Sequence, residues 1–327
     1  MVARLLAPLS QGLHGAYGLK DDAAALSPPA GSEFVITLDT LTAGLHFLFD
    51  GTPQSAAMAA HKALAVNVSD LSAKGAEPYA YFMSLALPEG FTKWLDEFVA
   101  GLASAQTEWD IKLAGGDTVR SMDRLTVTIA ALGLVDAGRM VRRSGAQEGD
   151  LLFISGTIGD AVAGLYLERG DEGTERWKDL LNPHDKDHLV DRCRKPSPRV
   201  GLIPALRQHA HAALDISDGL ALDTSRLAAA SGLAAQLRAP EIPVSKAVQH
   251  LLKEELIGLP DVLTGGDDYE ILAAVPPDDA DAFMEKAAAG QVAVTRIGEL
   301  KAGDALTVLD AAGHPISLTK LGWDHLG

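Results

Sequence analysis

The spacing of apolar residues between His61 and Ala76 predicts one long helix. Its apolar stripe contains Leu64, Val68 and Leu71, and the neighbouring stripe contains Ala63, Asn67, Asp70 and Lys74. Thr52-Pro53 is typical of a helix start and Gly75 of a helix end. Asp70 is thereby placed in mid-helix, where aspartate is a poor helix former. This stretch alone is compatible with a surface ion pair between Asp70 and Lys74, so the role of Asp70 depends on the rest of the chain.

Short apolar runs bounded by glycine, proline or acidic residues predict strands in two successive groups. The expected strands are Glu33–Leu38, Tyr79–Leu87, Ile111–Ala114, Leu125–Val135, Leu151–Ser155, Ala212–Ile216, Ile271–Val275 and Val292–Ile297. Further helices are expected at Thr92–Thr107, at Asp160–Glu168, after Gly219 through Ala230, and at Asp278–Ala289. Because the pattern restarts near Arg143-Ser144-Gly145, we predict a mixed α/β architecture in two domains, residues 1–144 and 145–327.

The segment Arg169–Lys195 is rich in charge and predicts a loop. His184 and His188 stand four apart in it, but their charged neighbours favour a solvated loop over a metal-binding pair. Gly156 and Gly159 lie between a strand and a helix without the G-x-G-x-x-G spacing of dinucleotide-binding folds. We therefore interpret both glycines as turn residues.

Composition restricts the partners and the compartment. With 44 acidic and 28 basic residues the 327-residue chain carries a formal charge of -16, which argues against nucleic acid and anionic membrane as partners. The single cysteine, Cys193, excludes an intrachain disulfide and fits a reducing compartment. The apolar run before Pro8 is too short for a signal peptide, and no stretch approaches transmembrane length. We expect a cytoplasmic protein.

Aspartates recur where strands end or glycine-rich turns begin. They are Asp22, Asp39, Asp70, Asp117, Asp215, Asp218 and Asp267. Each alone is explained by a helix cap or an Asx turn, but together they form a set of hard oxygen ligands suited to several Mg²⁺ ions with bound phosphates. The P-loop, the protein-kinase motifs, a zinc cluster and a G-x-S-x-G elbow are absent from the sequence. If phosphate is handled, metal ions and glycine-turn backbone handle it.

Five motifs in order resemble the thiamine-monophosphate kinases, a family within the aminoimidazole ribonucleotide synthetase-like superfamily. They are Lys62–Leu71 (KALAVNVSDL), Gly115–Thr118 (GGDT), Arg143–Ala146 (RSGA), Asp215–Leu220 (DISDGL) and Gly265–Glu270 (GGDDYE). Any one of these motifs is weak evidence by itself, whereas five in order are specific. The resemblance runs from about Gly18 to Trp323 and covers nearly the whole chain.

The resemblance implies the superfamily's two-domain fold and transfer of the γ-phosphate of ATP to thiamine monophosphate. The product would be thiamine diphosphate, in the final step of its biosynthesis, formed directly with several Mg²⁺ ions and without a catalytic side chain. It also implies a homodimer in which N-terminal-domain strands from both chains form a barrel. The N-terminal domain would bind ATP and Mg²⁺, and the C-terminal domain would contribute to the nucleotide and substrate site.

The resemblance further assigns roles to individual residues. Metal-ligand positions are Asp22, Thr37, Leu38, Asp39, Asp70, Asp117, Asp215 and Asp218, with Asp70 shared between ions. ATP-binding positions are Gly116, Asp117, Arg143 and Ser217, and substrate-binding positions are His46, Asp267 and Trp323. The aromatic face of Trp323 suits a flat cationic heterocycle, and Asp267 suits its charge.

Three positions depart from the family pattern. Lys20 replaces a glycine before the paired aspartates, and Asp267 replaces a longer glutamate. Leu38 replaces a hydroxyl residue, so any metal contact there must come from its backbone carbonyl. None of the departures removes a carboxylate.

Two other functions compete with the kinase. One is another ATP-dependent synthetase of the superfamily, against which the stretch Asn67–Ala76 and the terminal Gly322-Trp323-Asp324-His325 argue. The other is a non-catalytic protein that binds nucleotide or thiamine phosphate. The full aspartate set argues against this second alternative, because carboxylates gathered without a metal lower stability.

Overall fold

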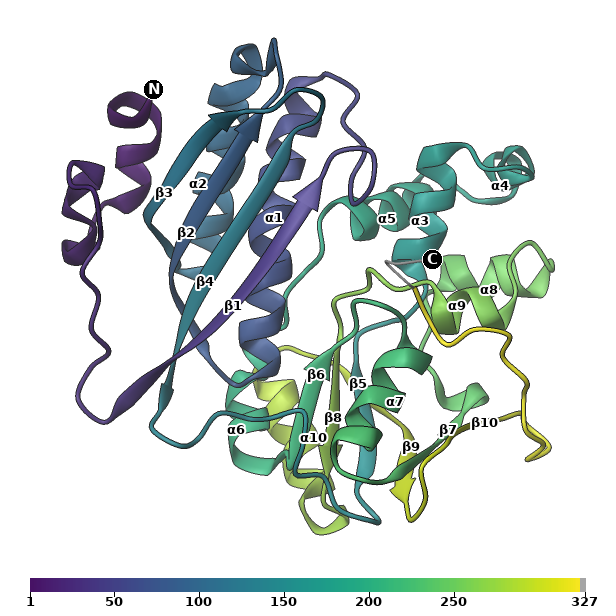
Figure 1. Cartoon of the computed structure of the whole chain (residues 1–327). Helices are drawn as coiled ribbons and strands as arrows, with labels where there is room; N and C mark the ends of the chain where they lie inside the picture. Colours follow the sequence, from purple (N-terminus) through teal and green to yellow (C-terminus); the bar gives the residue numbers. More distant parts are fainter. Residues whose placement is uncertain (324–327) are drawn as a thin grey trace. The chain divides into compact units, whose positions relative to one another are not determined.

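A computed structural model describes residues 1–323, with residue 178 described only in its backbone. The chain divides into two compact units, each combining helices with one sheet (Figure 1). The first unit comprises Met1–Ser72 and Ala76–Met140, and the second comprises Ala73–Gly75 and the chain from Val141 onward. The predicted mixed α/β architecture is confirmed. Asp324 and His325 of the terminal motif lie outside the described residues.

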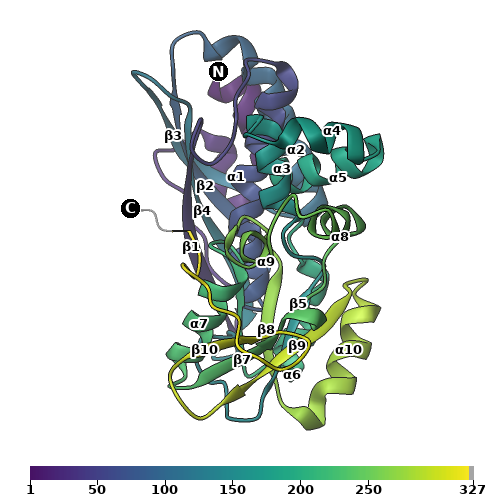
Figure 2. The same ribbon diagram turned by 90° about the vertical axis from the view of Figure 1, so that its right-hand side faces the viewer.

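The sheet of the first unit has the strand order β1-β4-β2-β3. Its strands are β1 (Ser32–Thr42), β4 (Thr126–Asp136), β2 (Glu77–Leu87) and β3 (Lys112–Arg120). Only β2 and β3 run parallel to each other. The helices α1 (Pro53–Ala73) and α2 (Leu95–Trp109) cover one face of this sheet (Figures 1 and 2). Short helical turns are η1 (Val2–Leu6), η2 (Ala7–Ser10), η3 (His14–Leu19) and η4 (Phe91–Trp94).

Alternation along β1 decides which side chains meet the helices. Val35 and Leu41 are buried toward α1 and α2, whereas Ile36 and Leu38 are 65% and 63% exposed on the opposite face. Since β1 and β3 are the two edges of the sheet, the described chain forms an open sheet and no closed barrel. The predicted dimer barrel therefore requires a second chain.

The second unit contains a mixed sheet with the order β10-β7-β9-β5-β8-β6. Its strands are β5 (Leu151–Ser155), β6 (Ala212–Asp215), β7 (Ala234–Arg238), β8 (Ile271–Val275), β9 (Val294–Lys301) and β10 (Leu306–Leu309). Its helices are α3 (Asp160–Arg169), α4 (Thr174–Leu180), α5 (Pro183–Arg194), α6 (Ile203–His209), α7 (Leu220–Ala230), α8 (Lys246–Lys253), α9 (Leu259–Thr264) and α10 (Ala280–Ala289). Short turns are η5 (Val200–Leu202), η6 (Ala239–Glu241) and η7 (Pro277–Asp279).

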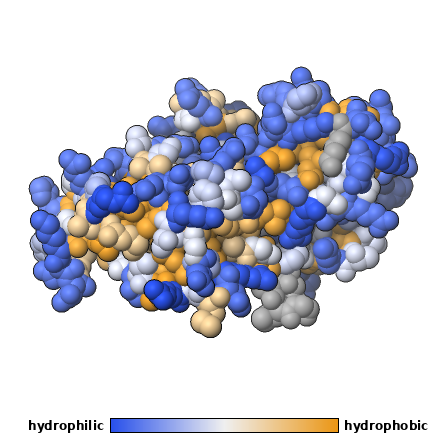
Figure 3. All heavy atoms as spheres, turned by 90° about the horizontal axis from the view of Figure 1, so that it is seen from above, coloured by the Kyte–Doolittle hydropathy of each residue, from blue (hydrophilic) through white to orange (hydrophobic). Residues whose placement is uncertain are grey.

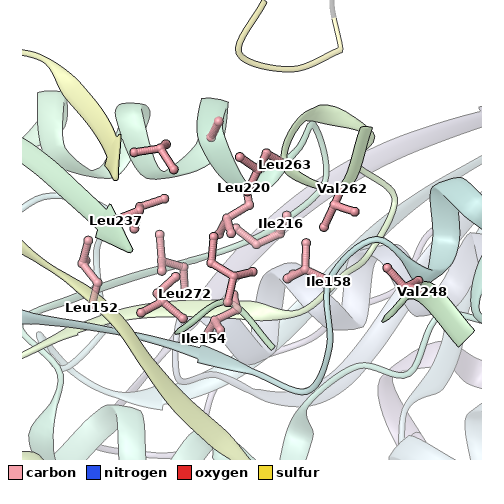
Figure 4. Packing of buried hydrophobic residues seen from close by; sticks show 14 of the residues in the cluster. Leu152, Ile154, Ile158, Ile216, Leu220, Leu237, Val248, Val262, Leu263 and Leu272 are labelled. Carbon is pink, nitrogen blue, oxygen red and sulfur yellow. The ribbon is translucent and has the colours of Figure 1, made fainter. Parts of the chain in front are cut away.

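Side chains of β5 point alternately into two hydrophobic cores. Leu152 and Ile154 join the core beneath α7, which Figure 4 shows from close by. Phe153 points the other way and packs with Phe283 in the core beneath α6 and α10. The sheet is thus buried on both faces, which explains why β5 and β8 are continuous apolar runs with the bounds predicted from sequence.

The start of α1 at Pro53 confirms the predicted helix start, but its polar stripe does not face water. Asn67 is fully buried and donates a hydrogen bond from Nδ2 to the Ala63 carbonyl at 3.0 Å. Ser69 and Ser72 are also fully buried. The helix therefore carries its polar groups into the interior of the first unit, where each needs a hydrogen-bond partner.

Two strands are longer than predicted, which changes the place of three predicted site residues. Asp39 lies inside β1, not just beyond it, and Gly116 and Asp117 lie inside β3, not in a turn. A Cβ atom at Gly116 would come within 1.9 Å of the Met83 carbonyl oxygen. The glycine therefore permits close approach of β2 instead of ending the strand.

The prediction of a loop at Arg169–Lys195 is wrong, because α4 and α5 occupy most of it. Asn182 caps α5 by accepting a hydrogen bond from the Asp185 backbone N–H at 3.0 Å, and Pro183 follows at the first helical position. His184 and His188 consequently lie on a helix. The Nε2 atom of His188 is 3.2 Å from the buried carboxylate of Asp160.

Within the described residues no helix is long and apolar enough to cross a membrane. One face of the molecule shows hydrophilic side chains over much of its area, with hydrophobic atoms visible between them (Figure 3).

Candidate active site

Three predicted metal-ligand residues meet where β1 packs on α1. The odd-numbered residues Thr37 and Asp39 point toward the helix, and the Thr37 hydroxyl donates a short hydrogen bond to the Asp70 carboxylate. Burial, together with the nearby charge of Asp70, raises the pKa of Asp39 to about 6. The two carboxylates are therefore close enough to repel each other, and a divalent cation between them would relieve that repulsion.

Asp22, Gly116 and Asp117 line one cavity of about 590 Å³ in the first unit. Residues of the N-terminal turns, including Met1, Val2 and Leu6, line it as well. Asp22 and Asp117 are both exposed, and an oxygen of Asp117 accepts a hydrogen bond from the Thr118 backbone N–H at 2.7 Å. The cavity is large enough for a small ligand and presents carboxylates and a bare glycine to it.

His46 and Leu38 complete the predicted set in the first unit. His46 is half-buried, and its Nδ1 accepts a hydrogen bond from the Thr42 backbone N–H at 3.0 Å. The Leu38 side chain points to the open face of the sheet, away from α1. Any ligand role of Leu38 must therefore fall to its backbone.

In the second unit the turn that follows β6 gathers three predicted site segments. The Ser217 carbonyl accepts a hydrogen bond from the Asp267 backbone N–H, and the Asp218 carbonyl accepts one from the Trp323 N–H, both at 2.8 Å. A Cβ atom at Gly266 would lie 2.5 Å from the Ser217 carbonyl oxygen, so only glycine fits there. Ser217, Asp218, Asp267 and Trp323 are thus brought together as neighbours.

Asp223 and Arg226, on α7, support this turn and were not singled out from the sequence. The Asp223 carboxylate is 2% exposed, and one of its oxygens accepts hydrogen bonds from the backbone N–H groups of Ser217 and Asp218 at 3.1 and 3.0 Å. Arg226 bonds both Asp223 and Asp218. Burial raises the pKa of Asp223, although the N–H of Asp218 and the Arg226 guanidinium act against burial. The sequence signal that could have identified Asp223 is its place as an acidic residue in the first turn of a predicted helix.

The glycine-rich loop that carries Asp267 is anchored by a buried network of charges. Glu270 is fully buried and bonds Arg192 at 2.9 Å, Arg199 at 2.6 Å and the Ser155 hydroxyl at 2.5 Å. Burial raises the pKa of the neighbouring Asp268 well above its usual range. Asp267 itself adopts a left-handed backbone conformation with a φ of 64°. Non-glycine residues rarely adopt this conformation, so the surrounding contacts must stabilise it.

Arg143 and Asp215 are placed less tightly. Arg143 is exposed in a segment whose Gly145 and Ala146 backbone N–H groups donate to the Ser231 hydroxyl at 3.2 and 3.1 Å. Asp215 is the half-buried last residue of β6, two residues before Ser217. Each residue is therefore two or three positions from backbone N–H groups that are held by hydrogen bonds, those of Gly145 and Ala146 for Arg143 and that of Ser217 for Asp215.

The donor set fits a hard cation, but the carboxylates meet in pairs. In the part of the chain that the structure describes, no group of three or more His, Cys, Asp or Glu side chains is arranged to hold a metal ion. The oxygens of Asp39, Asp70 and Thr37 are nevertheless the ligand type that Mg²⁺ prefers, and Mg²⁺ commonly takes one or two carboxylates with substrate phosphates. The residues present therefore fit Mg²⁺ bound together with phosphate.

The repulsion between Asp39 and Asp70 makes a testable prediction about pH. Because the pKa of Asp39 is about 6 in the fold and near 3.8 when unfolded, the folded protein binds more protons between these values. This group therefore stabilises the fold below about pH 4, and that contribution is lost as the pH rises through about 6. Asp39→Asn should stabilise the metal-free protein at pH 7.5 by up to about 3 kcal/mol, measured by urea unfolding.

The same variant tests the metal. In the wild type, Mg²⁺ should raise the unfolding midpoint at pH 7.5 and lose this effect below about pH 6, because the ligand must be ionised. In Asp39→Asn the Mg²⁺ effect should be smaller than in the wild type and should not fall further below about pH 6. The exposed Asp123→Asn is the control and should behave as the wild type. Equal Mg²⁺ stabilisation of wild type and Asp39→Asn would contradict the assignment.

Comparisons with known proteins define the class first. Residues 20–135 match the N-terminal domain of AIR synthase related proteins, and residues 147–311 match their C-terminal domain. The first match falls in the first unit except for Ala73–Gly75, and the second match falls in the second unit. The chain belongs to the AIR synthase related family.

Within this family the chain belongs with the thiamine-monophosphate kinases. The thiamine-monophosphate kinase of Caulobacter vibrioides is 40% identical over 328 residues, covering 99% of this chain and 89% of that protein. The crystal structure of thiamine-monophosphate kinase from Stenotrophomonas maltophilia K279a superposes with a TM-score of 0.79 at 38% identity, covering 89% of each chain. A structure described as AaThiL complexed with AMPPCP and TMP has a TM-score of 0.77 at 29% identity, covering 93% of this chain and 91% of that chain.

Proposed function

We propose that this protein transfers the γ-phosphate of ATP to thiamine monophosphate. A phosphate oxygen of thiamine monophosphate attacks the γ-phosphorus, the bond from that phosphorus to the β,γ-bridging oxygen breaks, and ADP leaves with thiamine diphosphate formed. The observation that carries the proposal is the similarity to thiamine-monophosphate kinases across both units, 40% identity over 99% of the chain. A relative of the same fold binds an ATP analogue together with TMP, which supports both substrates.

In the first unit, the proposed roles fall on carboxylates and backbone. Asp22, Thr37, Asp39, Asp70 and Asp117, with the Leu38 carbonyl, would hold Mg²⁺, which neutralises phosphate charge and orients the reacting groups. Gly116 would let nucleotide phosphates approach the backbone of β3, and His46 would contact the thiamine phosphate. The raised pKa of Asp39 supports a shared cation beside Asp70.

In the second unit, the turn after β6 supplies the remaining groups. Asp215 and Asp218 would bind metal, Ser217 and Arg143 would bind ATP, and Asp267 and Trp323 would bind the thiamine moiety. The backbone hydrogen bonds that tie Asp267 and Trp323 to Ser217 and Asp218 support this division, because they hold nucleotide and substrate groups at one turn. We further propose that the functional domains are residues 1–144 and 145–327.

The test is a balanced product assay. Purified protein with ATP, Mg²⁺ and thiamine monophosphate should yield ADP and thiamine diphosphate in equal amounts. Chromatography measures both products. Omitting Mg²⁺ or chelating it should stop the reaction. ADP and free phosphate without thiamine diphosphate would indicate a phosphohydrolase, and binding of both substrates without ADP would indicate a non-catalytic binding protein. Thermal stabilisation by thiamine monophosphate but not by aminoimidazole ribonucleotide precursors separates the kinase from the synthetases.

We also propose that two chains close their first-unit sheets into a barrel. The open face of the sheet carries Phe34 in tilted contact with Tyr79, at 5.6 Å between ring centroids, beside the exposed Ile36 and Leu38. An edge strand with such side chains invites pairing with another strand. Asp39 lies on the edge strand β1 and Asp117 on the opposite edge strand β3, three strand spacings or roughly 14 Å apart in one chain. A barrel that pairs β1 with the partner's β3 would make these two strands direct neighbours.

Mixing two inactive variants tests this shared arrangement. Asp39→Asn and Asp117→Asn should each be inactive alone, whereas a heterodimer of the two keeps one intact site out of two. Random reassociation should therefore restore about a quarter of wild-type activity. Ile36→Glu, which should leave the protein monomeric in light scattering, provides the matched control for subunit exchange. If the mixture of the two variants stays inactive although subunits exchange, the site does not combine β1 and β3 of different chains.

A further inference from the structure

The structure carries a pair of charged residues on α7 that the proposed function does not use. Asp223 and Arg226 lie three residues apart, and α7 begins directly after the turn formed by Ser217, Asp218 and Gly219. Asp223 is 2% exposed, and a carboxylate this deeply buried needs its oxygens hydrogen-bonded. The direction of those hydrogen bonds shows what the pair holds in place.

Asp223 fixes the backbone of the turn. Its Oδ2 atom accepts hydrogen bonds from two consecutive N–H groups, those of Ser217 at 3.1 Å and Asp218 at 3.0 Å. Two consecutive N–H groups converging on one anion define a backbone conformation more tightly than a single bond does. The conformation that presents the Ser217 hydroxyl and the Asp218 carboxylate therefore depends on Asp223.

Arg226 fixes the side chain of Asp218. Its Nη1 atom lies 2.8 Å from Oδ1 of Asp223 and 2.5 Å from Oδ2 of Asp218. Bonds between guanidinium and carboxylate are among the stronger hydrogen bonds in proteins. The Arg226 side chain remains 39% exposed, so the contact with Asp218 lies within reach of solvent and of incoming ions.

We propose that Asp223 and Arg226 are positioning residues. Asp223 holds the backbone of the Ser217–Asp218 turn. Arg226 neutralises the Asp218 carboxylate, and a divalent ion competes with it for that carboxylate. This inference rests on the proposed function, in which Asp218 binds Mg²⁺ and Ser217 binds ATP. In the absence of Mg²⁺ the guanidinium keeps the Asp218 carboxylate from being an isolated charge. A Mg²⁺ ion held by Asp218 would have to compete with Arg226 for this carboxylate, so the guanidinium would raise the Mg²⁺ concentration needed for activity.

Replacing Arg226 tests the competition. Arg226→Gln should lower the free Mg²⁺ concentration for half-maximal phosphate transfer about fivefold, because a partly exposed charge-assisted contact no longer has to be broken. The same leftward shift should appear in the Mg²⁺ dependence of the thermal unfolding midpoint, a readout that needs no catalysis. Arg238→Gln is the matched control, since Arg238 also contacts an acid three residues away, Glu241 at 2.6 Å. An unchanged or higher Mg²⁺ requirement for Arg226→Gln would overturn the role of Arg226.

Replacing Asp223 tests the positioning of the turn. Asp223→Ala should raise KM for ATP and lower kcat by about tenfold or more, with far-UV circular dichroism unchanged. Asp223→Asn retains one oxygen that can accept hydrogen bonds from the two N–H groups, so its KM for ATP should lie close to the wild-type value. Wild-type kinetics in both variants would overturn the role of Asp223.

The outcomes separate this inference from the proposed function. A wild type that transfers no phosphate to thiamine monophosphate would contradict the proposed function. The comparison of Mg²⁺-dependent unfolding between wild type and Arg226→Gln would still decide whether Arg226 competes with a cation at Asp218.

Discussion

Asp70→Asn should lower kcat for phosphate transfer by about 10³-fold or more while the protein stays folded. Asn is nearly isosteric with Asp and can still accept the hydrogen bond from the Thr37 hydroxyl. The variant loses only the negative charge that we propose is shared between metal ions. The neighbouring Val68 and Leu71 are fully buried and untouched, so the packing of α1 should be retained.

Steady-state kinetics over a range of Mg²⁺ concentrations, with the unfolding midpoint as a check of folding, measures this effect. The exposed Asp123→Asn carries the same chemical change outside the site and should keep wild-type kinetics. Because Asp70 contributes to the raised pKa of Asp39, Asp70→Asn should also lower that pKa toward its usual value. Near-normal transfer by Asp70→Asn would show that Asp70 is not a shared metal ligand.

The fold was predictable where burial leaves a clear pattern. β5 and β8 are buried on both faces and read as short apolar runs, and α1 begins at the proline that marked its start. The helix α5 was missed because its exposed charges hide a small buried face, of which Leu189 and Cys193 are members. Its cap at Asn182 was nevertheless visible in the sequence.

Glycine misled the prediction of β3. The predicted strand ends at Ala114 because glycine, which usually interrupts a strand, follows at positions 115 and 116. In the structure the strand continues to Arg120, since β2 passes so close to Gly116 that no side chain fits. Local sequence does not reveal how near another strand lies, so this outcome depends on tertiary context.

The candidate site was predictable as a set of residues but not as an arrangement. The order of the motifs identifies Asp39, Asp70 and Asp218 as candidates. The contact of Asp39 with Asp70 was not predictable, because Asp39 lies inside a strand that is longer than predicted and its side chain therefore points toward α1. No role was predicted for Asp223 and Arg226, because they act through hydrogen bonds to the backbone of Ser217 and the side chain of Asp218. Such contacts between residues are seen only in the three-dimensional structure.

The largest loss of stability is expected for substitution of Glu270, the last residue of the GGDDYE motif. Its carboxylate is fully buried between the guanidinium groups of Arg192 and Arg199. Glu270→Gln keeps the volume but leaves two largely buried positive charges without their counter-charge, which should cost about 3 kcal/mol. For a unit of this size the unfolding midpoint should fall by roughly 6–12 °C.

Calorimetry and urea unfolding measure this loss, with Glu299→Gln as the control. Glu299 pairs at the surface with Lys301, 3.0 Å away, so Glu299→Gln should change stability by only about 0.5 kcal/mol. Glu270 stands three residues after Asp267, so loosening the network should also raise KM for thiamine monophosphate more than KM for ATP. Adding Arg199→Met to Glu270→Gln should recover part of the lost stability, because it removes one of the two uncompensated charges. If Glu270→Gln is as stable as Glu299→Gln, Arg192 and Arg199 do not need the charge of Glu270. In that case backbone hydrogen bonds alone stabilise the left-handed conformation of Asp267.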